Sequence, residues 1–128
     1  KEDIAKLISN QPFNLIELGA GDGRKTTILL NYFIEKKLDI NYIPIDVSEG
    51  AIKNLSNSLK DRFENDSLNF HGLTADYFQG INWLNENSSQ RNLVFFLGSS
   101  IGNFDILSAK RFLKHLRDSC SAAALRRV

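Results

Sequence analysis

Short apolar runs alternate with longer amphipathic stretches along most of this chain. The apolar runs have the length and composition of buried strands, whereas the amphipathic stretches have the spacing of helices that cover a sheet. This alternation predicts an α/β protein in which helices flank a parallel sheet. The predicted strands are Asn14–Leu18, Asn41–Val47, Leu68–Leu73 and Arg91–Leu97.

The first two helices expected between these strands each carry apolar residues on one face. The first is predicted over Lys25–Lys36, and its apolar face consists of Ile28, Leu29, Tyr32 and Phe33. The second follows Ser48, whose hydroxyl is suited to cap it, and ends before Asn65. Its apolar face consists of Ile52, Leu55 and Leu59. Pro44 lies within the second strand and cannot donate to a neighbouring strand, so we expect an irregularity there.

Two further helical segments complete the pattern. Tyr77–Leu84 is expected to form a brief helix or a turn, and Asp105 is suited to cap a last helix. The residues of that helix expected to face the sheet are Ile106, Ala109, Phe112, Leu113 and Leu116. Four βα units are fewer than a complete doubly wound domain contains. We therefore expect residues 1–118 to be the N-terminal part of a Rossmann-like domain, followed by a frayed or non-native tail over 119–128.

Length and composition are those of one folded domain. The chain has 128 residues, of which 42% are hydrophobic and 24% charged, so neither a disordered tail nor a fibrous repeat is expected. Its 16 basic and 15 acidic residues give a formal net charge of +1 without a basic block. This charge pattern does not favour a nucleic-acid partner.

Membrane insertion, export and metal binding find no support in the sequence. The longest apolar run, Leu93–Leu97, is too short to cross a bilayer, and the N-terminus lacks a signal pattern. The single cysteine, Cys120, cannot form an internal disulfide, which favours a reducing, cytoplasmic setting. His71 and His115 show no metal-ligand spacing. Because the chain starts with Lys1 and contains no methionine, we expect it to be a fragment.

The candidate chemistry is concentrated where the first strand turns into the first helix. Glu17 precedes a glycine-rich segment in which Gly19, Gly21 and Gly23 alternate with other residues. Glycines at such a turn let the backbone approach a ligand closely, so a nucleotide-type site is implied. The dinucleotide fingerprint needs a third glycine where Arg24 stands, and the phosphate-binding Walker pattern cannot be written here. NAD binding and ATP hydrolysis are therefore disfavoured.

An acidic residue followed by G-x-G resembles the first motif of class I S-adenosylmethionine-dependent methyltransferases, whose glycine loop receives the amino-acid end of that cofactor. Asp46, at the end of the second strand, supports this interpretation because a carboxylate there can accept two hydrogen bonds from ribose hydroxyls. The alternative is that Asp46 only orders the turn into the next helix.

Two later segments complete the candidate site. Asp76 and Tyr77 follow the third strand, where the carboxylate could accept the amine of adenine and the ring could pack nearby. The alternative is a turn aspartate before a core aromatic residue. Asn103 follows the fourth strand, at the crevice beside the first strand, and its amide suits a zwitterionic amino acid. The alternative is that Asn103 shapes the entry to the last helix.

Three longer runs carry a more specific resemblance. Glu17–Leu30 (ELGAGDGRKTTILL), Tyr42–Ile52 (YIPIDVSEGAI) and Phe95–Phe104 (FFLGSSIGNF) together resemble the histidine-specific methyltransferase family, which includes the histidine Nα-methyltransferase of ergothioneine biosynthesis. The motifs occur in the same order. The resemblance implies a further substrate domain, downstream and partly inserted, that completes the pocket, and we expect this sequence to end before that domain.

The resemblance implies a role for each candidate residue. Gly19 and Lys25 would hold the methionine end of S-adenosylmethionine, Asp46 the ribose, and Asp76 with Tyr77 the adenine. Asn103 would contact a histidine-like amino acid. Lys25 could instead be a solvated residue of the first helical turn.

The function expected from this resemblance is methyl transfer to an amine nitrogen, with Glu17 and Gly21 among the cofactor-binding residues. The main task of the protein is then to position and desolvate the reactants. No residue stands out as a general base, and no catalytic residue is predicted beyond Asn103 as a positioning group. The alternatives are a class I methyltransferase with another acceptor, a nucleotide-binding module without turnover and, disfavoured by Arg24, a nicotinamide oxidoreductase.

Overall fold

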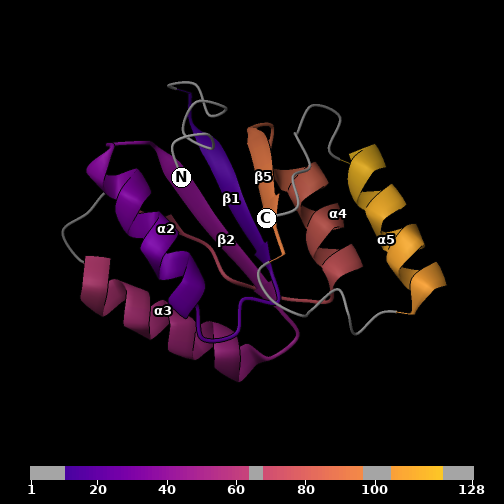
Figure 1. The fold of residues 1–128 in the computed structure, drawn as a ribbon, viewed down its shortest axis with the longest axis horizontal. Helices are drawn as coiled ribbons and strands as arrows, with labels where there is room; N and C mark the ends of the chain where they lie inside the picture. The colour runs from indigo at the N-terminus through magenta and orange to yellow at the C-terminus, as the bar shows by residue number, and fades with distance from the viewer. Residues whose placement is uncertain (1–10, 64–67, 97–104, 120–128) are drawn as a thin grey trace.

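A parallel sheet lies between two pairs of helices in the computed structural model, which describes residues 11–63, 68–96 and 105–119 (Figure 1). The predicted α/β class is confirmed. The elements are β1 (Phe13–Leu18), α2 (Arg24–Glu35), β2 (Ile40–Asp46), α3 (Glu49–Phe63), β3 (Asn69–Phe70), β4 (Leu73–Thr74), α4 (Tyr77–Asn87), β5 (Arg91–Phe95) and α5 (Ile106–Ser119).

The strands run in the order β3-β2-β1-β5, and β4 also pairs with β2. All of these pairings are parallel, so the carboxyl ends of the strands meet at one edge of the sheet. β1 lies between β2 and β5, which places the segment after β1 beside the ends of both neighbours. As expected for open α/β sheets, this edge is where a ligand would bind.

Both faces of β1 are buried, which explains its nearly continuous apolar sequence. Phe13 and Leu15 belong to a cluster with residues of α2 and α3, whereas Ile16 and Leu18 belong to a cluster with residues of α4 and α5. Figure 1 shows these two helix pairs on opposite sides of the sheet. Successive β1 side chains therefore point to different helix layers.

The buried face of α2 differs in part from the predicted one. Ile28 was expected on this face but is 58% exposed, so that prediction is wrong. The residues that α2 buries are Thr26, Thr27, Leu30 and Phe33. Thr26, Leu30 and Phe33 recur at helical spacing and form one stripe, from which Ile28 points away. Hydropathy alone does not mark a threonine as a buried position.

The third strand is interrupted, so the prediction of one strand over Leu68–Leu73 is wrong. β3 and β4 pair with β2 at its two ends, where the carbonyls of Tyr42 and Asp46 accept backbone hydrogen bonds of 2.9 and 3.0 Å. Pro44 lies midway between these carbonyls and has no N–H to donate on that side. The irregularity expected at this proline is confirmed.

Polar caps set the starts of the later helices as predicted. The Ser48 hydroxyl accepts from the third N–H of α3 at 3.1 Å, and Asp105 accepts from the Ser108 N–H at 2.8 Å. The Ser108 hydroxyl also donates to Asp105, at 2.8 Å. The backbone and side-chain hydrogen bonds from Ser108 together lower the pKa of Asp105. Tyr77–Leu84, expected to be a brief helix or a turn, is part of the longer α4.

In α5, Phe112 and Leu116 are buried as expected, but Ile106 is 75% exposed, contrary to the prediction. Ile106 lies in the first turn and, at 100° per residue, is rotated about 120° from Phe112. α5 ends at Ser119, one residue inside the predicted tail, and residues 120–128 lie outside the described residues. The boundary between domain and tail stays a prediction.

Membrane-spanning helices and metal-ligand clusters are both absent from the described ranges. No helix there is both long and apolar enough to cross a bilayer. In the same ranges, no three side chains of the His, Cys, Asp and Glu types are grouped so that they could hold a metal ion.

Candidate functional site

The segment between β1 and α2 is a tight loop that depends on its glycines. Gly19, Gly21 and Gly23 have φ angles of 70°, 56° and 70°, a left-handed conformation that other residues adopt only with strain. The Gly23 N–H donates to the Ala20 carbonyl at 3.1 Å and closes the turn. α2 begins directly after Gly23, so the loop leads into a helix N-terminus.

This glycine loop, residues 19–23, lies against the end of β2. The Gly19 N–H donates to the Ile45 carbonyl at 2.8 Å, and the Gly21 N–H donates to Asp46 Oδ2 at 3.3 Å. The two elements that were expected to bind one cofactor are therefore adjacent. At 3.3 Å the contact with Asp46 is long for a hydrogen bond, so a ligand hydroxyl can replace it at small cost.

Asp46 also has a local structural role. Its other oxygen, Oδ1, accepts from the Ser48 N–H at 2.9 Å, at the start of α3. This bond confirms the alternative interpretation that Asp46 orders the turn into α3. The same bond holds the carboxylate in place and leaves Oδ2 directed at the glycine loop.

The Gly21 side of the loop is open, whereas the Gly23 side is packed against α3. A Cβ atom built on Gly21 meets nothing within 4 Å, whereas one on Gly23 lies 2.3 Å from Leu55 Cδ1. Gly21 is exposed and Gly23 buried. An open backbone bend therefore lies beside the half-buried carboxylate of Asp46, and the role of Asp46 as acceptor for ribose hydroxyls stays a prediction.

Glu17 is buried beneath the loop. Only 2% of it is exposed, and its Oε2 accepts hydrogen bonds from the hydroxyls of Thr26 and Tyr42, the latter at 2.5 Å. Its role as a cofactor-binding residue stays a prediction. Burial raises the pKa of Glu17, although the bonds from the two hydroxyls act in the opposite direction. Burial and the neighbouring carboxylate also raise the pKa of Tyr42, which therefore remains a hydroxyl donor.

The raised pKa of Glu17 makes the stability of the fold depend on pH. Between the unfolded-state pKa and the higher folded-state value, the unfolded chain releases the Glu17 proton while the folded chain keeps it, so the free energy of unfolding falls as pH rises. Glu17→Gln removes this titration. The free energy of unfolding of the variant minus that of the unmodified protein is expected to increase from about pH 4 to neutral pH. Urea unfolding of both proteins at each pH measures this difference in free energy. A difference that falls or stays constant as pH rises would contradict the expectation.

Asp76 lies next to Asp46 along the same sheet edge. The Ala75 N–H donates to the Asp46 carbonyl at 3.0 Å, so the chain passes β2 just before α4. Asp76 caps α4 through a capping box with Gln79: its Oδ1 accepts from the Gln79 N–H at 2.8 Å. Tyr77 packs against Phe96 and Phe112. These local roles match the alternative interpretation of both residues, and their contact with adenine stays a prediction.

The other two candidates are placed differently. Lys25 is exposed in the first turn of α2, directly after the glycine loop. β5 ends at Phe95, whose register partner in β1 is Glu17, so the chain leaves β5 beside the glycine loop. Asn103 lies outside the described residues. The roles of Lys25 and Asn103 stay predictions.

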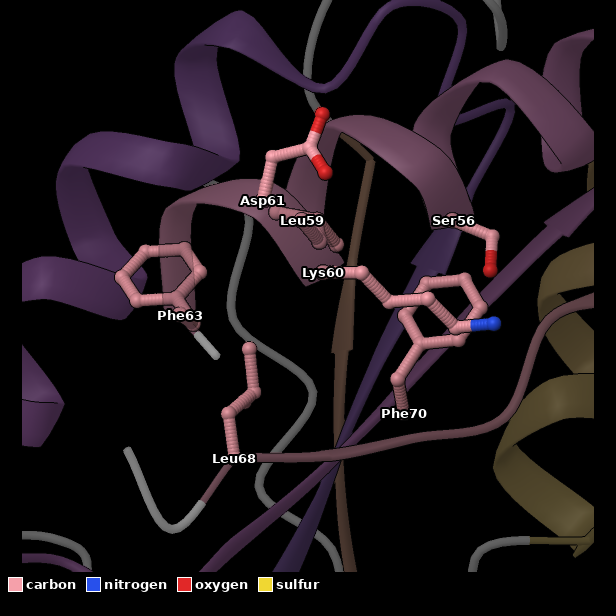
Figure 2. A pocket seen from close by; sticks show the side chains of 7 residues that line it. All are labelled: Ser56, Leu59, Lys60, Asp61, Phe63, Leu68 and Phe70. Carbon is pink, nitrogen blue, oxygen red and sulfur yellow. The ribbon is translucent and has the colours of Figure 1, made fainter. Parts of the chain in front are cut away.

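Two cavities lie away from this edge of the sheet. Figure 2 shows the larger, of about 390 Å³, between α3 and β3. It is lined by Ser56, Leu59, Lys60, Asp61, Phe63, Leu68 and Phe70. The other, of about 280 Å³, includes Asn14, Asn41 and Asn69, which lie in one row across the first halves of β1, β2 and β3. Neither is lined by the glycine loop or Asp46.

Comparison with known proteins identifies the family. Residues 1–125 match the family described as histidine-specific, SAM-dependent methyltransferases. The chain belongs to this family. The resemblance noted in the sequence is thereby confirmed, and S-adenosylmethionine (SAM) is the cofactor of the family.

Curated relatives of this methyltransferase-family chain are much longer than the chain itself. It is 35% identical over 106 residues to ergothioneine biosynthesis protein 1 of Neurospora crassa, covering 81% of the chain and 12% of that protein. It is 29% identical over 105 residues to the histidine N-alpha-methyltransferase of Mycolicibacterium smegmatis, covering 82% of the chain and 32% of the relative. The chain thus spans a minor part of each.

A solved structure supports the fold. The DszA carbon methyltransferase superimposes with a TM-score of 0.59 at 18% identity, covering 90% of this methyltransferase-family chain and 28% of the other chain. At this identity the similarity concerns the fold alone. The predicted Rossmann-like class I methyltransferase fold is confirmed, in partial form.

The sequence did not indicate Thr26 and Tyr42 as residues that support the candidate site. Both are fully buried and both contact the Glu17 carboxylate. A signal was present: Glu17 follows Phe13 and Leu15 at alternate positions of a strand that reads as buried on both faces. A carboxylate at such a position requires buried donors. The sequence does not reveal which hydroxyls supply them.

Proposed function

We propose that this chain is the cofactor-binding part of a SAM-dependent N-methyltransferase that acts on the amine of histidine or a related amino acid. The observation that supports it best is the contact between the Gly21 N–H and Asp46 Oδ2, which joins the glycine loop to the carboxylate at the end of the adjacent strand. Family membership supports the methyl-transfer chemistry and the histidine-like acceptor.

In this proposal each part of the sheet edge has one task. Asp46 accepts hydrogen bonds from the ribose hydroxyls, and Gly19, Gly21 and Lys25 lie along the methionine end. Asp76 and Tyr77 lie toward the adenine, and Asn103 contacts the amino-acid substrate. The charged acceptor at Asp46 contributes strongly, because hydrogen bonds to ionised groups are stronger than those between neutral groups.

The cofactor supplies a methyl group that is already activated by its bond to a sulfonium sulfur, so the protein need not provide a nucleophile. The chain's own residues bind, orient and desolvate the reactants. The substrate amine must be uncharged to attack, and its proton passes to solvent or to a nearby acceptor. A reducing, cytoplasmic setting and a small amino-acid substrate, with no nucleic-acid partner, belong to the same proposal.

An acceptor assay on the natural full-length protein tests this function. The protein is incubated with SAM and each amino acid separately, and the products are identified by mass spectrometry. We expect methylation of the α-amine of histidine or of a close analogue. Methylation of an unrelated acceptor alone would overturn the acceptor, and SAM binding without any methylated product would favour a module without turnover.

A further inference from the structure

The buried carboxylate of Glu17 links three elements by hydrogen bonds, close to the sheet edge where the carboxyl ends of the strands meet. Glu17 on β1, Thr26 on α2 and Tyr42 on β2 are all buried, and both hydroxyls donate to the same oxygen, Glu17 Oε2. The aromatic ring of Tyr42 is held in turn by an edge contact with Phe70 on β3, with the ring centres 5.9 Å apart. Contacts with α2, β2 and β3 therefore hold the Glu17, Thr26 and Tyr42 side chains in place.

The positions of these residues in the chain determine what the group restrains. Glu17 comes two residues before Gly19, and Thr26 comes three residues after Gly23, so their hydrogen bond ties together the two ends of the glycine loop. Tyr42 lies four residues before Asp46 on β2. The Tyr42 bond therefore connects the loop to the strand that carries Asp46.

Stability alone does not account for this arrangement. The neighbouring residues on that face of the sheet, Phe13, Leu15 and Ile40, are apolar and buried. An apolar residue at position 17 would avoid the desolvation of a carboxylate, and replacement of buried polar groups by well-packed apolar ones is often neutral or stabilising. What the polar group provides instead is a directional restraint between the loop and β2.

We propose that Thr26 and Tyr42 are positioning residues of the cofactor site, which act through Glu17 to hold the glycine loop at the separation from Asp46 that one bound nucleoside requires. Neither hydroxyl needs to touch the cofactor. This inference rests on the proposed function, because the site it serves is the SAM site.

Removal of single hydroxyl groups tests the proposal. Tyr42→Phe and Thr26→Val each remove one donor, whereas Thr26→Ser keeps it. Tyr32→Phe is the matched control, because Tyr32 is a half-buried tyrosine on α2 whose ring contacts Phe33 and Lys36 rather than a carboxylate. Affinity for S-adenosylhomocysteine is measured by calorimetry on the natural full-length protein, well below each melting temperature, so that only folded protein is compared.

We expect Tyr42→Phe and Thr26→Val to weaken binding on the order of three- to tenfold, with near-normal affinity in Thr26→Ser and Tyr32→Phe. A merely structural role would lower the melting temperature but leave the affinity of the folded protein unchanged, and that result would overturn the inference. If Tyr42→Phe does not fold, the Thr26→Val and Thr26→Ser pair decides. Absence of binding by the unmodified protein would instead overturn the proposed function itself.

Discussion

Replacement of Asp46 by alanine is expected to weaken S-adenosylhomocysteine binding by about 10- to 100-fold. We infer that the Asp46 carboxylate is the charged acceptor for the ribose hydroxyls, so alanine would remove both of these bonds. Its position 3.3 Å from the Gly21 N–H locates it at the glycine loop. Calorimetric titration of the folded variant measures the loss.

Two further variants separate binding from folding. Asp39 is an exposed aspartate just before the other end of β2, so Asp39→Ala removes a similar charge far from the glycine loop and should leave the affinity unchanged. Asp46→Asn keeps a side-chain oxygen for the Ser48 N–H but loses the charge, and it should bind more weakly than the unmodified protein. Equal affinity in Asp46→Ala and Asp39→Ala would remove Asp46 from the site.

Replacement of Gly23 by alanine is expected to destabilise the fold by about 2–5 kcal/mol. Two effects add. A left-handed φ of 70° is strained for any residue with a Cβ, and that Cβ would lie 2.3 Å from Leu55 Cδ1. Leu55 is 2% exposed and packed in the core, so it has little room to move away. Denaturant unfolding measures the change in free energy.

Gly21→Ala is the matched control for Gly23→Ala. Its φ of 56° is also left-handed, but the added Cβ would meet no atom within 4 Å. Only the conformational strain remains, so the expected destabilisation is about 1–2 kcal/mol. A larger loss at position 21 than at position 23 would mean that packing against α3 does not determine the shape of the loop.

The fold was largely predictable because its central strands, β1 and β2, are buried along most of their length. Near-continuous apolar runs such as Arg91–Leu97 indicate parallel strands, and β5 is found within that run, with Val94 and Phe95 buried. Ser48 and Asp105 were correctly predicted as caps because a side-chain oxygen just before an amphipathic stretch has few other roles. The irregularity near Pro44 followed from the missing N–H of proline.

The errors arose where hydropathy does not determine which side of a helix is buried. Ile28 and Ile106 are apolar yet exposed, whereas Thr26 is polar and fully buried against Glu17. The sequence offered no way to know that a carboxylate in β1 would recruit this hydroxyl. Contacts between residues far apart in the chain, such as that between Tyr42 and Glu17, are decided by tertiary packing and have no local signal.

The candidate site was predictable in its positions rather than in its contacts. The alternating glycines and Asp46 lie on adjacent strand ends, as the spacing indicated. Asp76 and Tyr77 also lie at this edge, but their visible contacts are a helix cap and aromatic packing. A sequence cannot distinguish a cap from a ligand contact, because one carboxylate can serve either purpose.

The glycine loop and Asp46 are proposed to hold one sulfonium nucleoside between them, and the other assignments at this edge depend on that pairing. Its most direct test is the melting temperature of the natural full-length protein, titrated in parallel with S-adenosylhomocysteine and with NAD. A ligand that binds only the folded state raises this temperature. We expect a concentration-dependent rise with S-adenosylhomocysteine and none with NAD, and a rise with NAD alone, or with neither, would contradict the proposed pairing.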